Sequence, residues 1–274
     1  MKNWLNDKTV IISGASGGIG FSIAKTLIEK FNCKIIGIAR NEEKLLKNLE
    51  SLGDKKANFS YCLFDVSIKE NWINFAKNLE ENNIVPDVLI NNAGFMLPFT
   101  KAENLSFDEI EKITNTNFLS VVYSTKTLLP LIKKSKTPAI INVSSAAGVS
   151  AVVGQSMYTG TKYAVRGYTQ TLEVENKKMY IAGIYPGFIK TDILKGANGE
   201  NNNASIIEKM STPLKKATNK IIRKIKKKRK NIVLGFGGKF LNFGGKHFPT
   251  FTSKIMAFVL RKAKLEMMKD LFNE

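Results

Sequence analysis

The sequence predicts an α/β protein with a single doubly wound parallel sheet. Short apolar runs, typical of buried strands, alternate along the chain with longer stretches whose apolar residues recur at helical spacing. The chain has 274 residues, which is enough to bury one large core. We expect strands to begin near Thr9, Lys34, Asn58, Asp87, Ala139, Met179 and Asn231, and long amphipathic helices to begin at Phe107 and Ser156.

The first expected strand leads into a glycine-rich turn, Ser13-Gly14-Ala15-Ser16-Gly17-Gly18-Ile19-Gly20, and an amphipathic helix follows. Strand, glycine turn and helix in this order are the context in which a loop binds a dinucleotide, as in the Rossmann fold. Glycine allows close approach of the backbone, and the new helix offers unpaired N–H groups to a pyrophosphate. A tight turn without a ligand is the alternative. We expect a dinucleotide to contact Gly14, Ser16, Gly18, Ile19 and Gly20.

The end of the second expected strand, Lys34 to Ala39, indicates which dinucleotide is preferred. A site for NAD places a carboxylate there, whereas the 2′-phosphate of NADP needs a cation. The chain has no acid at this point, and the guanidinium of Arg40 can bind a phosphate through two hydrogen bonds. We therefore predict NADP(H) as the preferred cofactor, with NAD(H) also accepted. A solvated Arg40 at the start of a helix is the alternative.

Ser145, Tyr158 and Lys162 have a spacing that could bring them together. Ser145 follows the apolar run Ala139 to Val143, and Tyr158 and Lys162 would lie one turn apart on one helix face. A tyrosine has an unperturbed pKa near ~10, so it needs a neighbouring cation to act as an acid or base at neutral pH. Tyr158 is therefore the predicted proton donor of a hydride-transfer site. The alternative is a surface tyrosine beside a solvated lysine.

Six motifs follow one another in an order that is itself informative: Gly14-x-x-x-Gly18-x-Gly20, Asn91-Asn92-Ala93-Gly94, Asn117, Ser145, Tyr158-x-x-x-Lys162 and Pro186-Gly187. In this order and at these separations the chain resembles the classical short-chain dehydrogenases/reductases, from about Asp7 to Asp192. The resemblance implies an enzyme acting on CH–OH groups, which interconverts a ketone and a secondary alcohol with NAD(P)(H).

The resemblance also implies roles for the catalytic residues. Tyr158 would give a proton to the carbonyl oxygen, and Ser145 would hydrogen-bond and polarise that oxygen. Lys162 would contact the nicotinamide ribose and lower the pKa of the tyrosine, and Asn117 would hold a water in a proton relay. Ser145 is preferred to Ser144 because its separation from Tyr158 matches the family, and Ser144 is expected to face the sheet.

Further cofactor contacts are implied by the same resemblance: Asp65 with the adenine amino group, Asn91, Ala93 and Gly94 near the adenosine ribose, and Pro186, Gly187 and Thr191 against the nicotinamide carboxamide. Gly17 is not basic, so the second cation that some NADP-binding relatives carry there is missing and the preference for NADP(H) is expected to be incomplete. The stretch Ile193 to Ser211 corresponds to a substrate lid in relatives.

The C-terminal part, residues 213–274, is expected to form a basic amphipathic extension that completes the catalytic domain of residues 1–212. Ten Lys or Arg and no acid lie between Lys215 and Lys230, in a chain of net charge +19. Aromatic and aliphatic residues follow, interrupted too often for a membrane span. We expect residues 215–272 to associate with an anionic membrane surface. The alternatives are apolar residues packed on the sheet or a partner subunit and lysines that are merely solvated.

The remaining predictions concern partners, substrate and compartment. Nucleic acid is not an expected partner, because no recognition motif accompanies the basic residues. The helices from Phe107 and Ser156 are expected to join copies of the chain in a homo-oligomer. A hydrophobic or lipid-like ketone is the expected substrate, with a 3-oxoacyl thioester as its rival and a non-catalytic NADP(H) sensor or scaffold as a different class of function.

Only Cys33 and Cys62 are present, with neither a disulfide framework nor metal-ligand spacing, so no metal is expected. The start of the sequence, from Met1 to Asn6, lacks an apolar core. A cytoplasmic protein, with peripheral membrane contact as an option, is therefore expected.

Overall fold

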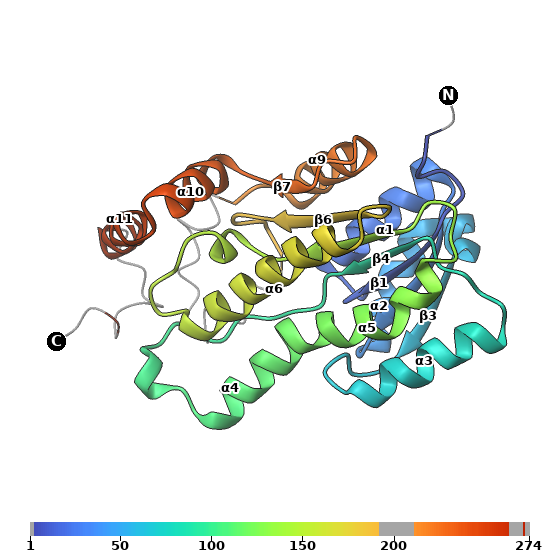
Figure 1. Cartoon of the computed structure of the whole chain (residues 1–274), viewed down its shortest axis with the longest axis horizontal. Helices are drawn as coiled ribbons and strands as arrows, with labels where there is room; N and C mark the ends of the chain where they lie inside the picture. Colours follow the sequence, from blue (N-terminus) through green and yellow to red (C-terminus); the bar gives the residue numbers. More distant parts are fainter. Residues whose placement is uncertain (1–2, 192–210, 263–270, 272–274) are drawn as a thin grey trace.

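A computed structural model of the chain describes residues 3–191 and 211–262 together with Leu271 (Figure 1). Seven parallel strands form one sheet in the order β3-β2-β1-β4-β5-β6-β7. The strands are β1 (Thr9–Ser13), β2 (Lys34–Ala39), β3 (Phe59–Leu63), β4 (Val88–Asn91), β5 (Ala139–Val143), β6 (Tyr180–Tyr185) and β7 (Asn231–Val233). The predicted fold class is confirmed, and every strand begins within one residue of the expected position.

Helices cover both faces of this sheet (Figure 1). They are α1 (Gly18–Phe31), α2 (Glu42–Leu49), α3 (Lys69–Glu81), α4 (Phe107–Thr114), α5 (Ser120–Ile132), α6 (Ser156–Glu175), α9 (Leu214–Lys226), α10 (Phe236–His247) and α11 (Pro249–Lys262). The apolar sides of α1, α2 and α9 pack on one face, and those of α3, α5 and α6 pack on the other. The central strands are therefore buried on both sides, which explains why they appear in the sequence as continuous apolar runs.

The strand order reverses between β1 and β4. The chain builds outward from β1 through β2 to β3, and then returns to build the other half from β4 to β7. The connections after β1 and β4 therefore run to opposite faces of the sheet. In open parallel sheets, ligands bind at the carboxyl ends of the strands at such a switch point. The glycine turn and the Asn91-Asn92-Ala93-Gly94 segment both follow the strands at this point.

The helix expected from Phe107 is interrupted. Ser106 and Glu109 form a capping box that starts α4 where the sequence predicts. The segment Asn115–Leu119 then forms a π turn before α5 continues to Ile132. A π turn inserts one residue into the helical repeat and is frequent at functional sites. The sequence pattern did not predict it.

The C-terminal segment completes the sheet. Helix α9 packs against α1 and buries Ala217, Ile221, Ile222 and Ile225, while β7 pairs with β6. For α9 and β7, the alternative that the apolar C-terminal residues pack on the sheet is thus correct. Helices α10 and α11 lie beyond β7 (Figure 1). No helix in residues 3–191 and 211–262 is both long and apolar enough to span a bilayer. The predicted lid, apart from Ser211, lies outside the described residues.

Candidate active site

Ser144 and Ser145, which follow β5, have different partners. The Ser144 hydroxyl donates to the backbone oxygen of Lys162 at 2.8 Å. The Ser145 hydroxyl accepts from the backbone N–H of Ala147 at 3.1 Å, and it is close enough to the phenol of Tyr158 to oppose the rise that burial causes in the pKa of this tyrosine. Ser144 was expected to face the sheet; it is buried, and its hydroxyl bonds the backbone of α6 instead. Only Ser145 therefore presents its hydroxyl to the tyrosine.

Tyr158 and Lys162 lie one turn apart on α6, with their side chains turned into the protein. They are only 7% and 3% exposed, so the alternative of a surface tyrosine beside a solvated lysine does not describe this pair. The Lys162 ammonium donates to the backbone oxygen of Val143 at 3.3 Å and lies 5.6 Å from the centre of the Tyr158 ring. Ser145, Tyr158 and Lys162 thus form one buried cluster at the carboxyl end of β5.

Burial dominates the electrostatics of this cluster. It raises the pKa of Tyr158, and the hydrogen bond with Ser145 opposes this rise. It lowers the pKa of Lys162 to about 8, because the charged ammonium is desolvated. The lysine still carries its proton for most of the time at neutral pH. The predicted lowering of the tyrosine pKa by Lys162 stays a prediction, since burial is the larger influence in the protein alone.

The π turn directs Asn117 toward the loop after β4. Its amide oxygen accepts from the backbone N–H of Phe95 at 2.9 Å, and its amide nitrogen donates to the backbone oxygen of Phe95 at 2.9 Å. Gly94 lies beside this pair: a Cβ there would be 3.1 Å from the Asn117 oxygen and 3.2 Å from the Lys162 ammonium. Asn117 therefore fixes the loop that passes Lys162. Its expected role in a water relay stays a prediction.

The glycine turn after β1 is joined directly to the end of β4. Gly14 and Gly18 have positive φ, at 68° and 53°. The Asn92 amide donates to the backbone oxygens of Ser13 and Gly14 at 3.0 and 3.2 Å. The Ser13 hydroxyl in turn accepts from the backbone N–H groups of Asn92 and Ala93 at 3.0 and 3.1 Å. Gly14, Ser16, Gly18, Ile19 and Gly20 all belong to this braced turn.

Asn91 braces the sheet from inside. Its amide nitrogen donates to Asn142 on β5 at 2.9 Å, and its amide oxygen accepts from Ser124 on α5 at 2.7 Å. Because both polar atoms of the Asn91 side chain are already hydrogen-bonded, only its backbone can contact a cofactor. The sequence predicted a cofactor contact for Asn91 and no separate role for Asn92. The repeated asparagine directly after an apolar run is the feature that could have indicated the bracing role of Asn92.

Arg40 and Asp65 meet beyond the ends of β2 and β3. The guanidinium donates to one carboxylate oxygen of Asp65 at 3.2 Å, and the other carboxylate oxygen accepts from the N–H and hydroxyl of Ser67. Partial burial would raise the pKa of Asp65, but the hydrogen bonds from Ser67 and the charge of Arg40 outweigh it and hold this pKa below the ordinary value. The two residues predicted to contact the adenosine half of the cofactor are thus neighbours.

The turn after β6 connects to both halves of the site. The Pro186 carbonyl accepts from the N–H of Ala146 at 2.7 Å, next to Ser145, and the N–H of Gly187 donates to Leu234 at 3.4 Å. Thr191 faces the glycine turn, because a Cβ at Gly18 would lie 3.7 Å from its methyl group. The predicted residues therefore form one continuous rim along the carboxyl ends of β2, β1, β4, β5 and β6.

Comparisons with known proteins agree with this arrangement. A family model described as short chain dehydrogenase matches residues 8–202. The chain is 32% identical to an NADP-dependent 3-hydroxy acid dehydrogenase of Schizosaccharomyces pombe, over 77% of this chain and 83% of that protein. It is 34% identical to a 3-oxoacyl-[acyl-carrier-protein] reductase of Chlamydia trachomatis, over 74% of this chain and 82% of the relative.

A solved structure gives the same result for the fold. The alcohol dehydrogenase of the archaeon Thermococcus sibiricus, complexed with 5-hydroxy-NADP, superimposes with a TM-score of 0.71 at 25% identity, covering 83% of this chain and 94% of that one. The match of the family model over most of the chain and the identity with these relatives establish that this protein belongs to the classical short-chain dehydrogenase/reductase family of oxidoreductases.

Proposed function

We propose that the protein is an NADP(H)-dependent oxidoreductase that interconverts a ketone and a secondary alcohol, with Tyr158 as the acid and base. The observation that carries the proposal is the cluster in which the buried Tyr158 lies beside Ser145, with the Lys162 ammonium 5.6 Å from the centre of its ring. A retired enzyme would have no chemical need for this cluster, which weighs against the alternative of a non-catalytic sensor or scaffold.

Each residue of the cluster has a defined task in carbonyl reduction. A reduced nicotinamide, when bound, would supply the hydride for the carbonyl carbon. Tyr158 gives its phenolic proton to the carbonyl oxygen, and Ser145 donates a hydrogen bond to the same oxygen. Lys162 holds a positive charge near the phenol and so favours the phenolate left behind. In the direction of alcohol oxidation the phenolate takes the proton back.

The preference for NADP(H) rests on the end of β2. Arg40 is the first residue after this strand, and no carboxylate from the strand end would meet a 2′-phosphate. Its present partner Asp65 is exchangeable, since the ion pair is partly exposed to water. The Schizosaccharomyces pombe relative is described as NADP-dependent, and the Thermococcus sibiricus enzyme is complexed with 5-hydroxy-NADP, which supports the same choice.

The substrate is proposed to be hydrophobic or lipid-like. Two relatives support a narrower alternative, because one is named for a 3-hydroxy acid and the other for a 3-oxoacyl group on a carrier protein. A 3-oxoacyl thioester has an apolar chain, as a lipid does, and its acyl group is attached to an acidic carrier protein. The basic C-terminal segment would suit such a carrier by charge.

The first test is NADPH oxidation followed at 340 nm with long-chain ketones, steroid ketones, 3-oxoacyl thioesters and small aldehydes, repeated with NADH. Turnover confined to one class would identify the substrate. Tyr158→Phe should lower turnover by about 10²- to 10⁴-fold and leave NADPH binding intact. Tyr163→Phe, on the same helix but partly exposed, is the matched control. Full activity of Tyr158→Phe would overturn the assigned mechanism.

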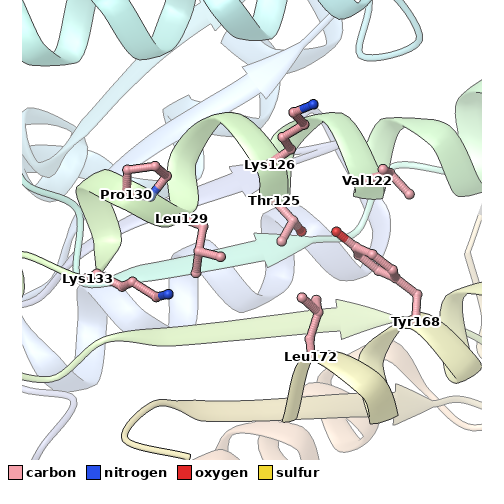
Figure 2. Close-up of a pocket in the computed structure, with 8 residues that line it drawn as sticks. All are labelled: Val122, Thr125, Lys126, Leu129, Pro130, Lys133, Tyr168 and Leu172. Atoms are coloured by element: carbon pink, nitrogen blue, oxygen red, sulfur yellow. The ribbon is translucent and has the colours of Figure 1, made fainter. Parts of the chain in front are cut away.

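We also propose a homo-oligomer formed through α5 and α6. Tyr168 and Leu172 of α6 face Thr125 and Leu129 of α5 across an open groove of about 570 Å³ (Figure 2). Tyr168 is ten residues from Tyr158, roughly 15 Å along the helix, so this groove is separate from the catalytic cluster. Val122→Glu at the groove should shift the mass measured by light scattering toward the monomer, while NADPH binding is kept.

Peripheral binding to an anionic membrane is a further proposal for α10 and α11. Four phenylalanines in these helices or directly between them are 59–65% exposed, namely Phe243, Phe248, Phe251 and Phe258. The sequence has no acid from 213 to 262. Exposed aromatic side chains beside cations favour an anionic lipid surface.

Because α9 and β7 belong to the core, substitutions test membrane binding better than truncation. Phe248→Ser/Phe251→Ser should pellet less with vesicles containing phosphatidylserine than the unmodified chain does. Phe107→Ser, which changes an 82% exposed phenylalanine on α4, is the control. Equal pelleting of all three proteins would remove the membrane proposal.

A further inference from the structure

Lys44 of helix α2 lies against the glycine turn. A Cβ at Gly17 would be 2.9 Å from the Lys44 Cε and 3.4 Å from its ammonium nitrogen. The lysine therefore occupies the space that a side chain at position 17 would take. The backbone of Gly17 is extended, with φ 178° and ψ −169°, so that any residue could adopt it. What glycine provides at this position is room for Lys44.

Helix α2 is anchored in a way that fixes this contact. Asn41 caps the helix by accepting from the N–H of Lys44 at 2.7 Å. One turn later Asn48 donates to the backbone oxygen of Ser16 in the glycine turn at 2.9 Å. Residues four apart share one helix face, so Lys44 and Asn48 approach the turn together. The buried Leu45 holds the helix on the core.

The charged residues near the glycine turn include a second cation besides Arg40. Arg40 shares its charge with Asp65, whose carboxylate lies 3.2 Å away. The acid of α2 nearest to Arg40 in sequence, Glu42, is turned to the hydroxyl of Tyr61 at 2.9 Å. The Lys44 ammonium brings a positive charge to the glycine turn, and Lys44 follows Arg40 by four residues in the chain.

We propose that Lys44 is the second cation for the 2′-phosphate of NADP(H). The inference rests on the proposed cofactor preference and deepens it. The sequence predicts an incomplete preference for NADP(H), because Gly17 is not basic. Helix α2 supplies the missing charge instead, and the bare backbone of Gly17 admits it.

Binding of adenosine 2′,5′-bisphosphate and of 5′-AMP to the purified full chain, measured by calorimetry, tests this role without turnover. Lys44→Met should weaken the bisphosphate by about tenfold and leave 5′-AMP unchanged, because a charge-assisted hydrogen bond to the 2′-phosphate is lost. Lys47→Met, on an exposed part of the same helix, should change neither. Lys44→Met should likewise raise the dissociation constant of NADPH and leave that of NADH unchanged, and Lys47→Met should change neither.

A rescue variant separates charge from helix integrity. Gly17→Arg placed in the Lys44→Met background should restore tighter binding of the bisphosphate, because it returns a cation to the same space. If the unmodified protein and Lys44→Met both bound the bisphosphate more tightly than 5′-AMP, and by the same factor, the inference about Lys44 would be overturned. The proposed function would still stand. Unmodified protein that does not distinguish the two ligands would overturn the NADP(H) preference, and the role of Lys44 with it.

Discussion

The hydroxyl of Ser144 donates a hydrogen bond to the backbone oxygen of Lys162 at 2.8 Å. Ser145 turns its own hydroxyl to Tyr158. Successive residues of an extended chain point in opposite directions, so two adjacent serines can serve helix packing and chemistry separately. Replacing each serine by alanine removes the same hydroxyl oxygen at two neighbouring positions and so tests these two roles separately.

Ser145→Ala should lower kcat by about 10²- to 10³-fold, because it removes a hydrogen bond to the oxygen that gains charge. Stability should change little. Ser144→Ala should keep most of the activity but reduce the free energy of unfolding by about 0.5–1.5 kcal/mol, since it removes one buried hydrogen bond to α6. Steady-state kinetics and urea unfolding of both variants measure the contrast. The opposite pattern would assign the catalytic hydroxyl to Ser144.

Lys162 should make stability depend on pH in a known direction. Its pKa is about 8 in the folded protein and 10.5 in an ordinary environment, so the unfolded chain binds more protons between these values. The free energy of unfolding therefore decreases as the pH falls from about 10.5 to 8. Below pH 8 the destabilisation caused by burying Lys162 stays constant. Lys162→Met removes that cost and should stabilise the protein at pH 7 by up to about 3 kcal/mol.

Urea unfolding at pH 7 and pH 10 measures this effect. The gain of Lys162→Met over the unmodified chain should be large at pH 7 and small at pH 10. Tyrosine ionisation affects both proteins and largely cancels in the difference. Lys47→Met, which changes an exposed lysine, should give the same small effect at both pH values. A gain for Lys162→Met that is independent of pH would mean that folding does not lower the pKa of this lysine.

Much of this fold could be predicted from the sequence, for physical reasons. Strands such as β5 and β6 are buried on both faces, so they appear as unbroken apolar runs. The Tyr158 and Lys162 pair is a local helical relationship, which spacing alone describes. Predicting the position of Ser145 required only one further rule, that the carboxyl ends of parallel strands lie at the same edge of the sheet.

What the sequence did not predict depends on contacts between distant segments. The π turn at Asn115–Leu119 leaves no mark in the apolar pattern, although it directs Asn117 to Phe95. The bracing role of Asn92 needs the adjacency of β1 and β4. The contact of Lys44 with Gly17 needs the packing of α2 on the glycine turn. Each is decided by topology, which local spacing does not contain.

Gly94→Ala should disturb the cluster through sterics alone. The added methyl would lie 3.1 Å from the Asn117 oxygen and 3.2 Å from the Lys162 ammonium, both tighter than ordinary contacts. Moving Lys162 by a few tenths of an ångström should lower kcat roughly tenfold, with little change in fold.

Gly160→Ala is the matched control for the Gly94 variant, because nothing lies within 4 Å of its added methyl on α6. It should keep full activity and gain about 0.5–1 kcal/mol in stability. Kinetics and thermal unfolding compare the two variants. Equal activity of both would mean that the loop at Gly94 can yield without moving the lysine.

Gly245→Ala tests whether the C-terminal helices support the catalytic loop. A Cβ at Gly245 in α10 would overlap the backbone oxygen of Val149, in the buried segment that follows Ser145. A backbone atom cannot turn aside as a flexible side chain can, so α10 must move away from this segment. We expect a loss of about 1–3 kcal/mol in the free energy of unfolding, as in overpacked cores, and lower kcat.

The control for this variant is Gly167→Ala, whose added methyl meets nothing within 4 Å. Urea unfolding, kinetics and limited proteolysis should separate the two variants, with faster cleavage near α10 only in Gly245→Ala. If Gly245→Ala lost stability but kept kcat, α10 would support the fold without positioning Ser145. If it lost neither, α10 would not rest on Val149, and the C-terminal helices would be independent of the site. Loss of both would make the basic C-terminal segment a structural part of the active site, so that any partner bound to α10 and α11 could act on catalysis through Val149.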